Sequence, residues 1–115
     1  MEALRTHYRL FLAGKGEFSA PDSCGQMREE FRWLDRIAAL QGGAVPDLVH
    51  RTWIYCRDID NNYRGLVEGR NGCFDRYGLT PESHFIASTG IEGCTDLPGR
   101  LLHMDSLGIA GLELG

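Results

Sequence analysis

The stretch Val49-His-Arg-Thr-Trp-Ile-Tyr-Cys-Arg57 decides the fold, because it is the clearest β-strand in the chain. β-Branched and aromatic side chains fill most of its positions, and these residue types favour strands. The segments before and after it differ, since their apolar residues recur at three- and four-residue spacing, as in amphipathic helices. Strand and helix therefore alternate along this part of the chain.

Each expected helix carries its own boundary signals. The first is predicted from the capping box Ser23-x-x-Gln26 to about residue 41, where two glycines stop it. The second is predicted over about residues 61–77, with Asp58 or Asp60 as its cap. The apolar stripe of the first helix is Met27, Phe31, Leu34, Ile37 and Leu40, and that of the second is Tyr63, Leu66, Val67, Cys73, Phe74 and Tyr77.

Three further strands are predicted at residues 8–13, 84–91 and 100–110, which makes the order β-α-β-α-β-β. Two βαβ units imply right-handed crossovers and parallel neighbouring strands. Two helices cannot cover both faces of a four-stranded sheet, so we expect an α+β fold with both helices on one face. The uncovered face predicts oligomerisation through that surface.

The composition excludes several classes of protein. The 115 residues fit one domain, and the net charge of −4 with a pI near 5.5 argues against a nucleic-acid partner. No apolar run approaches the ~20 residues of a membrane span, so no membrane partner is expected. Four cysteines without a CxxC pair indicate thiols in a reducing, cytoplasmic compartment, and the histidines are scattered. We therefore predict neither a metal nor a cofactor.

Arg70 is a candidate ligand-binding residue. It lies seven positions after Tyr63, on the apolar stripe of the second helix, where a guanidinium needs a counter-charge or a ligand. In one interpretation it is an edge residue or part of a structural ion pair. In the other it clamps a carboxylate, because the two-pronged guanidinium suits that group.

His103 and Asp105 are candidate catalytic residues. They lie two positions apart on one face of the last predicted strand, among apolar residues. One interpretation is an internal hydrogen bond that satisfies both groups. The other is that this face borders a cleft or a subunit interface, where either side chain could handle a proton.

The run from Asp47 to Ile59 also carries a family resemblance. Its pattern of aspartate, valine, threonine, hydrophobic residues and a second aspartate matches at Asp47, Leu48, Val49, Thr52 to Tyr55 and Asp58. Together with Leu12-Ala-Gly14 and the segment Phe85 to Gly93, it resembles the Rid family of reactive intermediate deaminases, also labelled YjgF or L-PSP endoribonuclease. The resemblance covers about residues 8 to 110.

This resemblance implies a chorismate-mutase-like fold in a homotrimer whose open sheet faces form a barrel-like core. It implies one Rid-like domain over residues 1–115, with most of the N-terminal hairpin missing, and sites in clefts between subunits. In deaminating members an arginine grips the substrate carboxylate while water attacks an imine, which releases ammonia and a 2-keto acid. Ala87 stands at that arginine position, and the family's acidic residue aligns near His103, with Asp105 two residues later.

A shorter resemblance, from Gly69-Arg70-Asn71 and Ala87 to Ile91, is to chorismatase-type relatives, which hydrolyse an enol ether. Two hypotheses follow. The first is a hydrolase for a small carboxylate-bearing imine or enol ether, with Arg70 as the clamp and His103 or Asp105 positioning water. The second is a non-catalytic ligand-binding or assembly module, motivated by Ala87. The predicted substrate-binding residues are Arg70, Ser88, Thr89 and Gly90.

Overall fold

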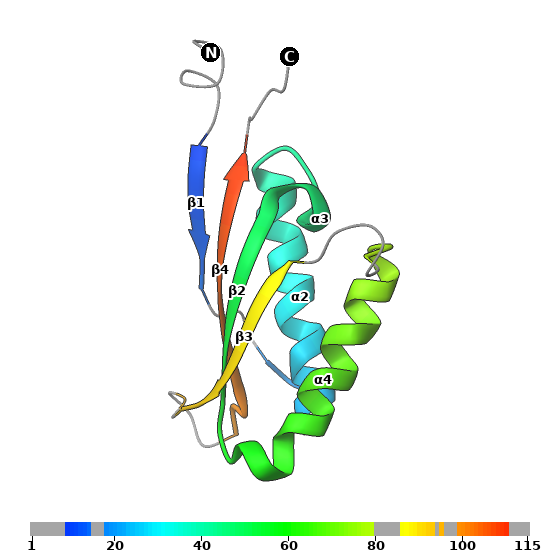
Figure 1. Ribbon diagram of the computed structural model, residues 1–115, viewed down its shortest axis with the longest axis vertical. Coiled ribbons are helices and arrows are strands. Elements are labelled where there is room, and N and C mark those ends of the chain that lie inside the picture. Colours follow the sequence, from blue (N-terminus) through cyan, green and yellow to red (C-terminus); the bar gives the residue numbers. More distant parts are fainter. Residues whose placement is uncertain (1–8, 15–17, 80–85, 94, 96–98, 111–115) are drawn as a thin grey trace.

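The described part of the chain has two layers, a four-stranded sheet and a pair of long helices on one of its faces (Figure 1). A computed structural model describes residues 9–14, 18–79, 86–93, 95 and 99–110. The elements are β1 (Arg9–Ala13), α2 (Ser23–Leu40), α3 (Val45–Leu48), β2 (Val49–Cys56), α4 (Ile59–Arg76), β3 (Ala87–Glu92) and β4 (Leu102–Ala110). The predicted α+β class and the one-sided helix layer are confirmed. The sequence did not predict the single helical turn α3.

The sheet is mixed, with strand order β1-β4-β2-β3. β2 and β3 are parallel, whereas β4 runs antiparallel to both of its neighbours, β1 and β2. The prediction of parallel neighbours is therefore correct for β2 and β3 and wrong for β1 and β2, which β4 separates. Hydrophobic alternation identifies the buried side of each strand but carries no information about which strands pair.

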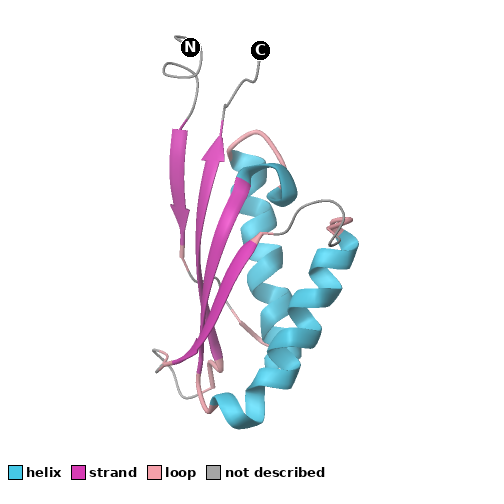
Figure 2. Cartoon of the chain, viewed as in Figure 1, coloured by secondary structure: helices cyan, strands magenta, loops and turns pink. Residues whose placement is uncertain are grey.

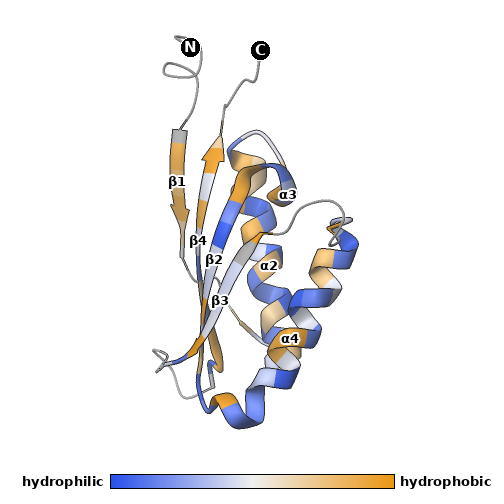
Figure 3. Cartoon of the chain, in the orientation of Figure 1, coloured by the Kyte–Doolittle hydropathy of each residue, from blue (hydrophilic) through white to orange (hydrophobic). Residues whose placement is uncertain are grey.

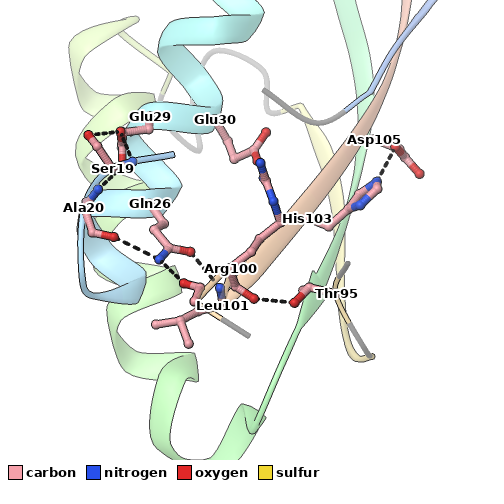
Figure 4. A network of polar contacts seen from close by, with 11 residues as sticks. Ser19, Ala20, Gln26, Glu29, Glu30, Thr95, Arg100, Leu101, His103 and Asp105 are labelled. Carbon is pink, nitrogen blue, oxygen red and sulfur yellow. Dashed lines mark hydrogen bonds and ion pairs between the residues drawn. The ribbon is translucent and has the colours of Figure 1, made fainter. Parts of the chain in front are cut away.

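The start of α2 differs from the predicted capping box. Asp22 is the N-cap, and its carboxylate accepts a hydrogen bond of 2.7 Å from the backbone N–H of Gly25. Ser23 is buried inside the helix, and Gln26 extends away from the helix start. The Gln26 amide donates to the carbonyls of Ala20 and Gly99 and accepts from the N–H of Leu101 (Figure 4). Gln26 thus connects α2 to the segment that leads into β4.

Two glycines allow the helices to pack closely. A Cβ at Gly65 would overlap the Ser23 hydroxyl, and one at Gly69 would lie 2.7 Å from the carbonyl oxygen of Cys24. Both positions are therefore contact points at which α4 touches the backbone and side chains of α2. Apolar side chains from both helices and from the covered sheet face complete the core, including Met27, Phe31, Leu34, Ile54, Leu66, Leu102 and Met104.

A buried ion pair joins α2 to the segment before β4, and an aromatic–glycine contact joins β1 to β4. The Arg100 guanidinium donates to Glu30 at 2.9 Å, with about 5% of either side chain exposed, and lies over the ring of Phe18. On β1, Phe11 is the register partner of Gly108 on β4, and a Cβ at Gly108 would overlap the Phe11 ring. Both contacts belong to the helix-covered side of the sheet.

The opposite face of the sheet is uncovered in the single chain (Figure 2). On β1, Leu10 is 64% exposed and Leu12 is 80% exposed, and Ile91 on β3 is 46% exposed. Figure 3 shows apolar residues along β1 and toward the end of β4, beside a more polar central part of β2. We refer to this surface as the open face.

Candidate functional site

A β-bulge in β2 decides which side chains reach the open face. The pairing with β4 shifts between Val49, which faces Gly108, and Arg51, which faces Leu107, so His50 is the extra residue. Val49 is buried on the helix side despite lying two positions before Arg51. From there the alternation is regular: Thr52, Ile54 and Cys56 are buried, while Arg51, Trp53 and Tyr55 are half-buried on the open face.

His103 and Asp105 lie together on the open face of β4. The Nε2 atom of His103 is 2.8 Å from Oδ1 of Asp105 (Figure 4), and their side chains are 27% and 45% exposed. The Tyr55 ring packs edge-on against the imidazole, with centroids 5.7 Å apart. The carboxylate therefore holds one ring nitrogen, and the other nitrogen is the one that can exchange a proton with a ligand or water.

An open hollow lies beside this pair. Its volume is about 420 Å³, within the size range of pockets that bind small molecules. A glycine forms part of the wall, and a Cβ at Gly14 would lie 3.9 Å from Oδ1 of Asp105. The lining residues are Leu12, Ala13, Gly14, Trp53, Tyr55, Asp105 and Ser106. The Asp105 carboxylate thus borders a space that a small metabolite could enter.

Arg51 is a cationic group of the open face that the sequence interpretation did not select. Its Nη2 donates to the Oγ1 atom of Thr89 on β3, and its guanidinium lies 5.3 Å from the centroid of the Trp53 ring. In the described part of the chain, no carboxylate forms an ion pair with it. The alternation of the strand could have identified it. Arg51 directly precedes Thr52, which is buried on the helix side, so the Arg51 side chain points to the open face.

The three predicted binding residues of β3 are divided between the two faces. Thr89 lies on the open face with Arg51. Ser88 faces the helices, where its hydroxyl accepts a 3.0 Å hydrogen bond from Oγ1 of the buried Thr52. Gly90 also faces the helix side, because a Cβ there would lie 4.0 Å from the ring of Tyr63. Consecutive strand residues point in opposite directions, so these three cannot contact one ligand on one face.

Arg70 lies in the helix layer. It is half-buried on α4, and the sheet separates that layer from the open face (Figure 1). Within one chain, the structure therefore does not bring Arg70 together with His103 and Asp105. Its predicted role as a carboxylate clamp remains a prediction.

The two buried cysteines, Cys56 and Cys73, lack the lowered pKa of an activated nucleophile. Burial raises the pKa of the Cys56 thiol to about 11, and the nearby carboxylates of Asp58 and Glu92 raise it further. Burial also raises the pKa of Cys73. Both thiols are thus protonated at neutral pH, when neither is a good nucleophile. Cys94 lies outside the described residues.

The described ranges contain no cluster of three or more potential metal ligands. Across the same ranges, every helix is too short or too polar to cross a lipid bilayer.

No protein-family model matches this sequence, and no curated protein sequence matches it either. Solved structures do match. Rv2704 from Mycobacterium tuberculosis, a member of the highly conserved YjgF/YER057c/UK114 family, is 24% identical with a TM-score of 0.69, over 86% of this chain and 77% of that one. The chain has the fold of the YjgF/YER057c/UK114 family.

Two further YjgF-fold structures support this assignment. The YjgF gene product of E. coli is 18% identical with a TM-score of 0.70, over 90% of this chain and 80% of its own. E. coli TdcF, whose crystal structure contains bound serine, is 16% identical with a TM-score of 0.71, over 90% and 81% of the two chains. The resemblance to the Rid family is thereby confirmed at the level of the fold.

Proposed function

We propose that the open face binds a small carboxylate metabolite, with His103 and Asp105 handling a proton. The observation that carries this proposal is the 2.8 Å contact between His103 and Asp105, beside a hollow of about 420 Å³ that Asp105 helps to line. A histidine–carboxylate pair at a ligand-sized hollow on an uncovered face is typical of proton-transfer sites. TdcF has a similar fold and holds serine, a small molecule with a carboxylate.

The site is proposed to be completed by assembly into a homotrimer. Leu10 and Leu12 are 64% and 80% exposed on β1, and Leu12 also lines the hollow. Burying such side chains against another copy removes apolar area from water, which is favourable. Three copies joined through their open faces would close the hollow on its solvent side. Cys24, Cys56 and Cys73 are free thiols, which is compatible with the reducing, cytoplasmic environment proposed for the chain.

The proposed reaction is hydrolysis of a 2-imino acid. Asp105 or His103 accepts a proton from water while the water oxygen forms a bond to the imine carbon. The electron pair of the C=N bond moves to the nitrogen. The protonated side chain returns that proton to the nitrogen, which gives a neutral carbinolamine. A second proton then reaches the nitrogen while the hydroxyl oxygen loses its proton and forms the C=O bond, so the C–N bond breaks and ammonia leaves. The products are ammonia and a 2-keto acid, so water is the only co-reactant and no redox change occurs.

Of the predicted binding residues on β3, Thr89 is the one that lies on the same face of the sheet as this hollow. A ligand contact by Arg70, Ser88 or Gly90 would need a second location on the helix side of the sheet, or a second copy of the chain. The enol-ether hydrolysis suggested by the chorismatase resemblance would use the same proton-handling pair on a different leaving group.

A non-catalytic binding module is the second candidate function. The observation that favours it is Ala87, which stands on β3 at the position where the Rid resemblance expects the substrate-binding arginine. In this alternative the hollow still binds a small 2-keto acid but releases no ammonia from an imine.

The deciding experiment supplies the purified chain with 2-aminoacrylate generated in situ and follows ammonia release. We expect release above the buffer rate for the wild type and its loss in Asp105→Asn, with pyruvate binding retained at least in part. Pyruvate binding without ammonia release would support the binding module. Absence of both would contradict the proposed function. Sedimentation velocity tests the trimer in the same samples.

A further inference from the structure

The Arg51 side chain has an unusual combination of burial, charge and contacts. It is half-buried on the open face, and one of its five N–H groups donates to the Thr89 hydroxyl. Its guanidinium packs over Trp53, which restrains the plane of the group. A partly desolvated cation without a carboxylate partner in the described residues is costly unless an anion completes it.

We propose that Arg51 is the residue that binds the ligand carboxylate, with the Thr89 hydroxyl as a second donor. This inference rests on the proposed function and names the group that gives the site its preference for acids. The guanidinium presents parallel N–H donors that match the two oxygens of a carboxylate. Because Thr89 Oγ1 already accepts from Arg51, its own hydroxyl proton is free to donate to the same anion.

The position of Arg51 relative to Asp105 suits a small 2-keto or 2-imino acid. Trp53 is the register partner of Asp105, and Arg51 lies two residues earlier on the same strand face. Two residues span roughly 7 Å along a strand. Because the Arg51 guanidinium reaches toward Thr89 on β3, a carboxylate held there would lie across the Trp53 ring from Asp105 on β4. The rest of the ligand would extend over that ring to reach the His103–Asp105 pair.

The strand register offers a direct test of this assignment. Arg51 is paired with Ala87 in the parallel β2–β3 ladder, so an arginine at either position belongs to the same face and the same level of the sheet. If Arg51 is the clamp, Ala87→Arg should restore carboxylate binding when Arg51 has been removed. Position 87 is also where the Rid resemblance expects the clamp, so recovery would show that this level of the sheet accepts a carboxylate, while Arg51→Gln alone tests the assignment of Arg51.

The experiment measures the dissociation constants of pyruvate and of its neutral amide, pyruvamide, by isothermal titration calorimetry on the assembled wild type and variants. We expect Arg51→Gln to weaken pyruvate binding by about 10- to 100-fold, as for loss of hydrogen bonds to a charged group. Pyruvamide binding should change much less, so the acid-over-amide preference should collapse. Arg51→Gln with Ala87→Arg should recover part of that preference. Arg64→Gln, an exposed arginine on α4, controls for loss of charge.

The outcomes separate the two proposals. If the wild type binds neither compound, the proposed function fails. If the wild type prefers pyruvate and Arg51→Gln keeps that preference, or if Arg70→Gln loses it instead, the Arg51 assignment is overturned while the proposed function stands. Equal weakening of both compounds would mean a structural role and would also overturn it. Should Arg51→Gln fail to fold, Arg51→Lys keeps the charge without the fork and is expected to lose most of the acid preference.

Discussion

The two faces of the sheet use polar residues in different ways. On the helix-covered face, two pairs of polar groups bind each other: Thr52 donates to Ser88, and Glu30 receives the Arg100 guanidinium at 2.9 Å. On the open face, Arg51 meets a hydroxyl and an aromatic ring, and His103 and Asp105 lie beside a hollow. The comparison teaches that the covered face pairs charged and polar groups within one chain, whereas the open face leaves apolar side chains, a guanidinium and a hollow accessible to solvent.

Breaking the buried ion pair should have the largest effect on the covered face. Glu30→Ala leaves the Arg100 charge buried, so we expect the free energy of unfolding to fall by about 3–5 kcal/mol. Urea denaturation of the variant measures this. The matched control is Glu68→Ala, because the Arg64–Glu68 pair is exposed and such pairs contribute little. Equal losses in the two variants would mean that burial does not distinguish these pairs.

The open face should respond through assembly and not through the fold of the single chain. Leu12 is 80% exposed in one copy, and burying a leucine at an interface is worth about 1.5–3 kcal/mol for each copy. We expect Leu12→Ser to shift the sedimentation coefficient toward the monomer while the far-UV circular dichroism spectrum stays unchanged. An unaltered assembly would place the contact between copies elsewhere.

Two glycines on α4, Gly69 and Gly72, allow a buried contact between helices to be compared with an exposed helix position. A Cβ at Gly69 would lie 2.8 Å from Cβ of Met27, so Gly69→Ala should cost about 1–3 kcal/mol through overpacking. Gly72 is exposed, and its nearest neighbour would be 4.0 Å away, at Arg28. There the same change should stabilise by about 0.5–1 kcal/mol through helix propensity. Thermal melts of the two variants should therefore move in opposite directions.

The smallest expected effect concerns the pH dependence of stability. Burial alone would raise the pKa of Glu29, but hydrogen bonds from Ala20 and Ser19 outweigh it and lower the pKa from its ordinary value of 4.5. The carboxylate therefore contributes stability above about pH 4.5, and this is lost as the pH falls through the lower folded-state pKa. The unfolding free energies of the wild type and Glu29→Gln should converge on acidification. A constant gap between pH 6 and pH 3 would contradict this.

Much of the fold could be predicted from residue patterns, because alternation and three-to-four spacing report which side chains are buried. The strand around Thr52 and the helix around Phe31 are two such cases. Strand pairing could not be predicted, since the central place of β4 depends on contacts distant in sequence. The role of Gly65 and Gly69 as contact points between α2 and α4 was also not predicted. Glycine has no side chain, so it does not contribute to the pattern of apolar residues from which buried positions are recognised.

Part of the candidate site could be predicted from the spacing of residues within one strand. His103 and Asp105 share a strand face, and a spacing of two residues is enough to establish that. Arg70 was selected by helical periodicity and by a short resemblance to chorismatase-type relatives, neither of which reveals that the sheet separates it from them. Arg51 was overlooked although its neighbours alternate, because the bulge at His50 resets the alternation just before it.

That bulge has a consequence for how the protein can vary. Because His50 is an extra residue, Val49 is buried on the helix side although Arg51, Trp53 and Tyr55 point to the open face. We therefore expect a change in the length of the connection upstream of His50 to leave Arg51, Trp53 and Tyr55 on the open face. The bulge at His50 would then make the orientation of the open-face residues of β2 independent of the length of the preceding connection.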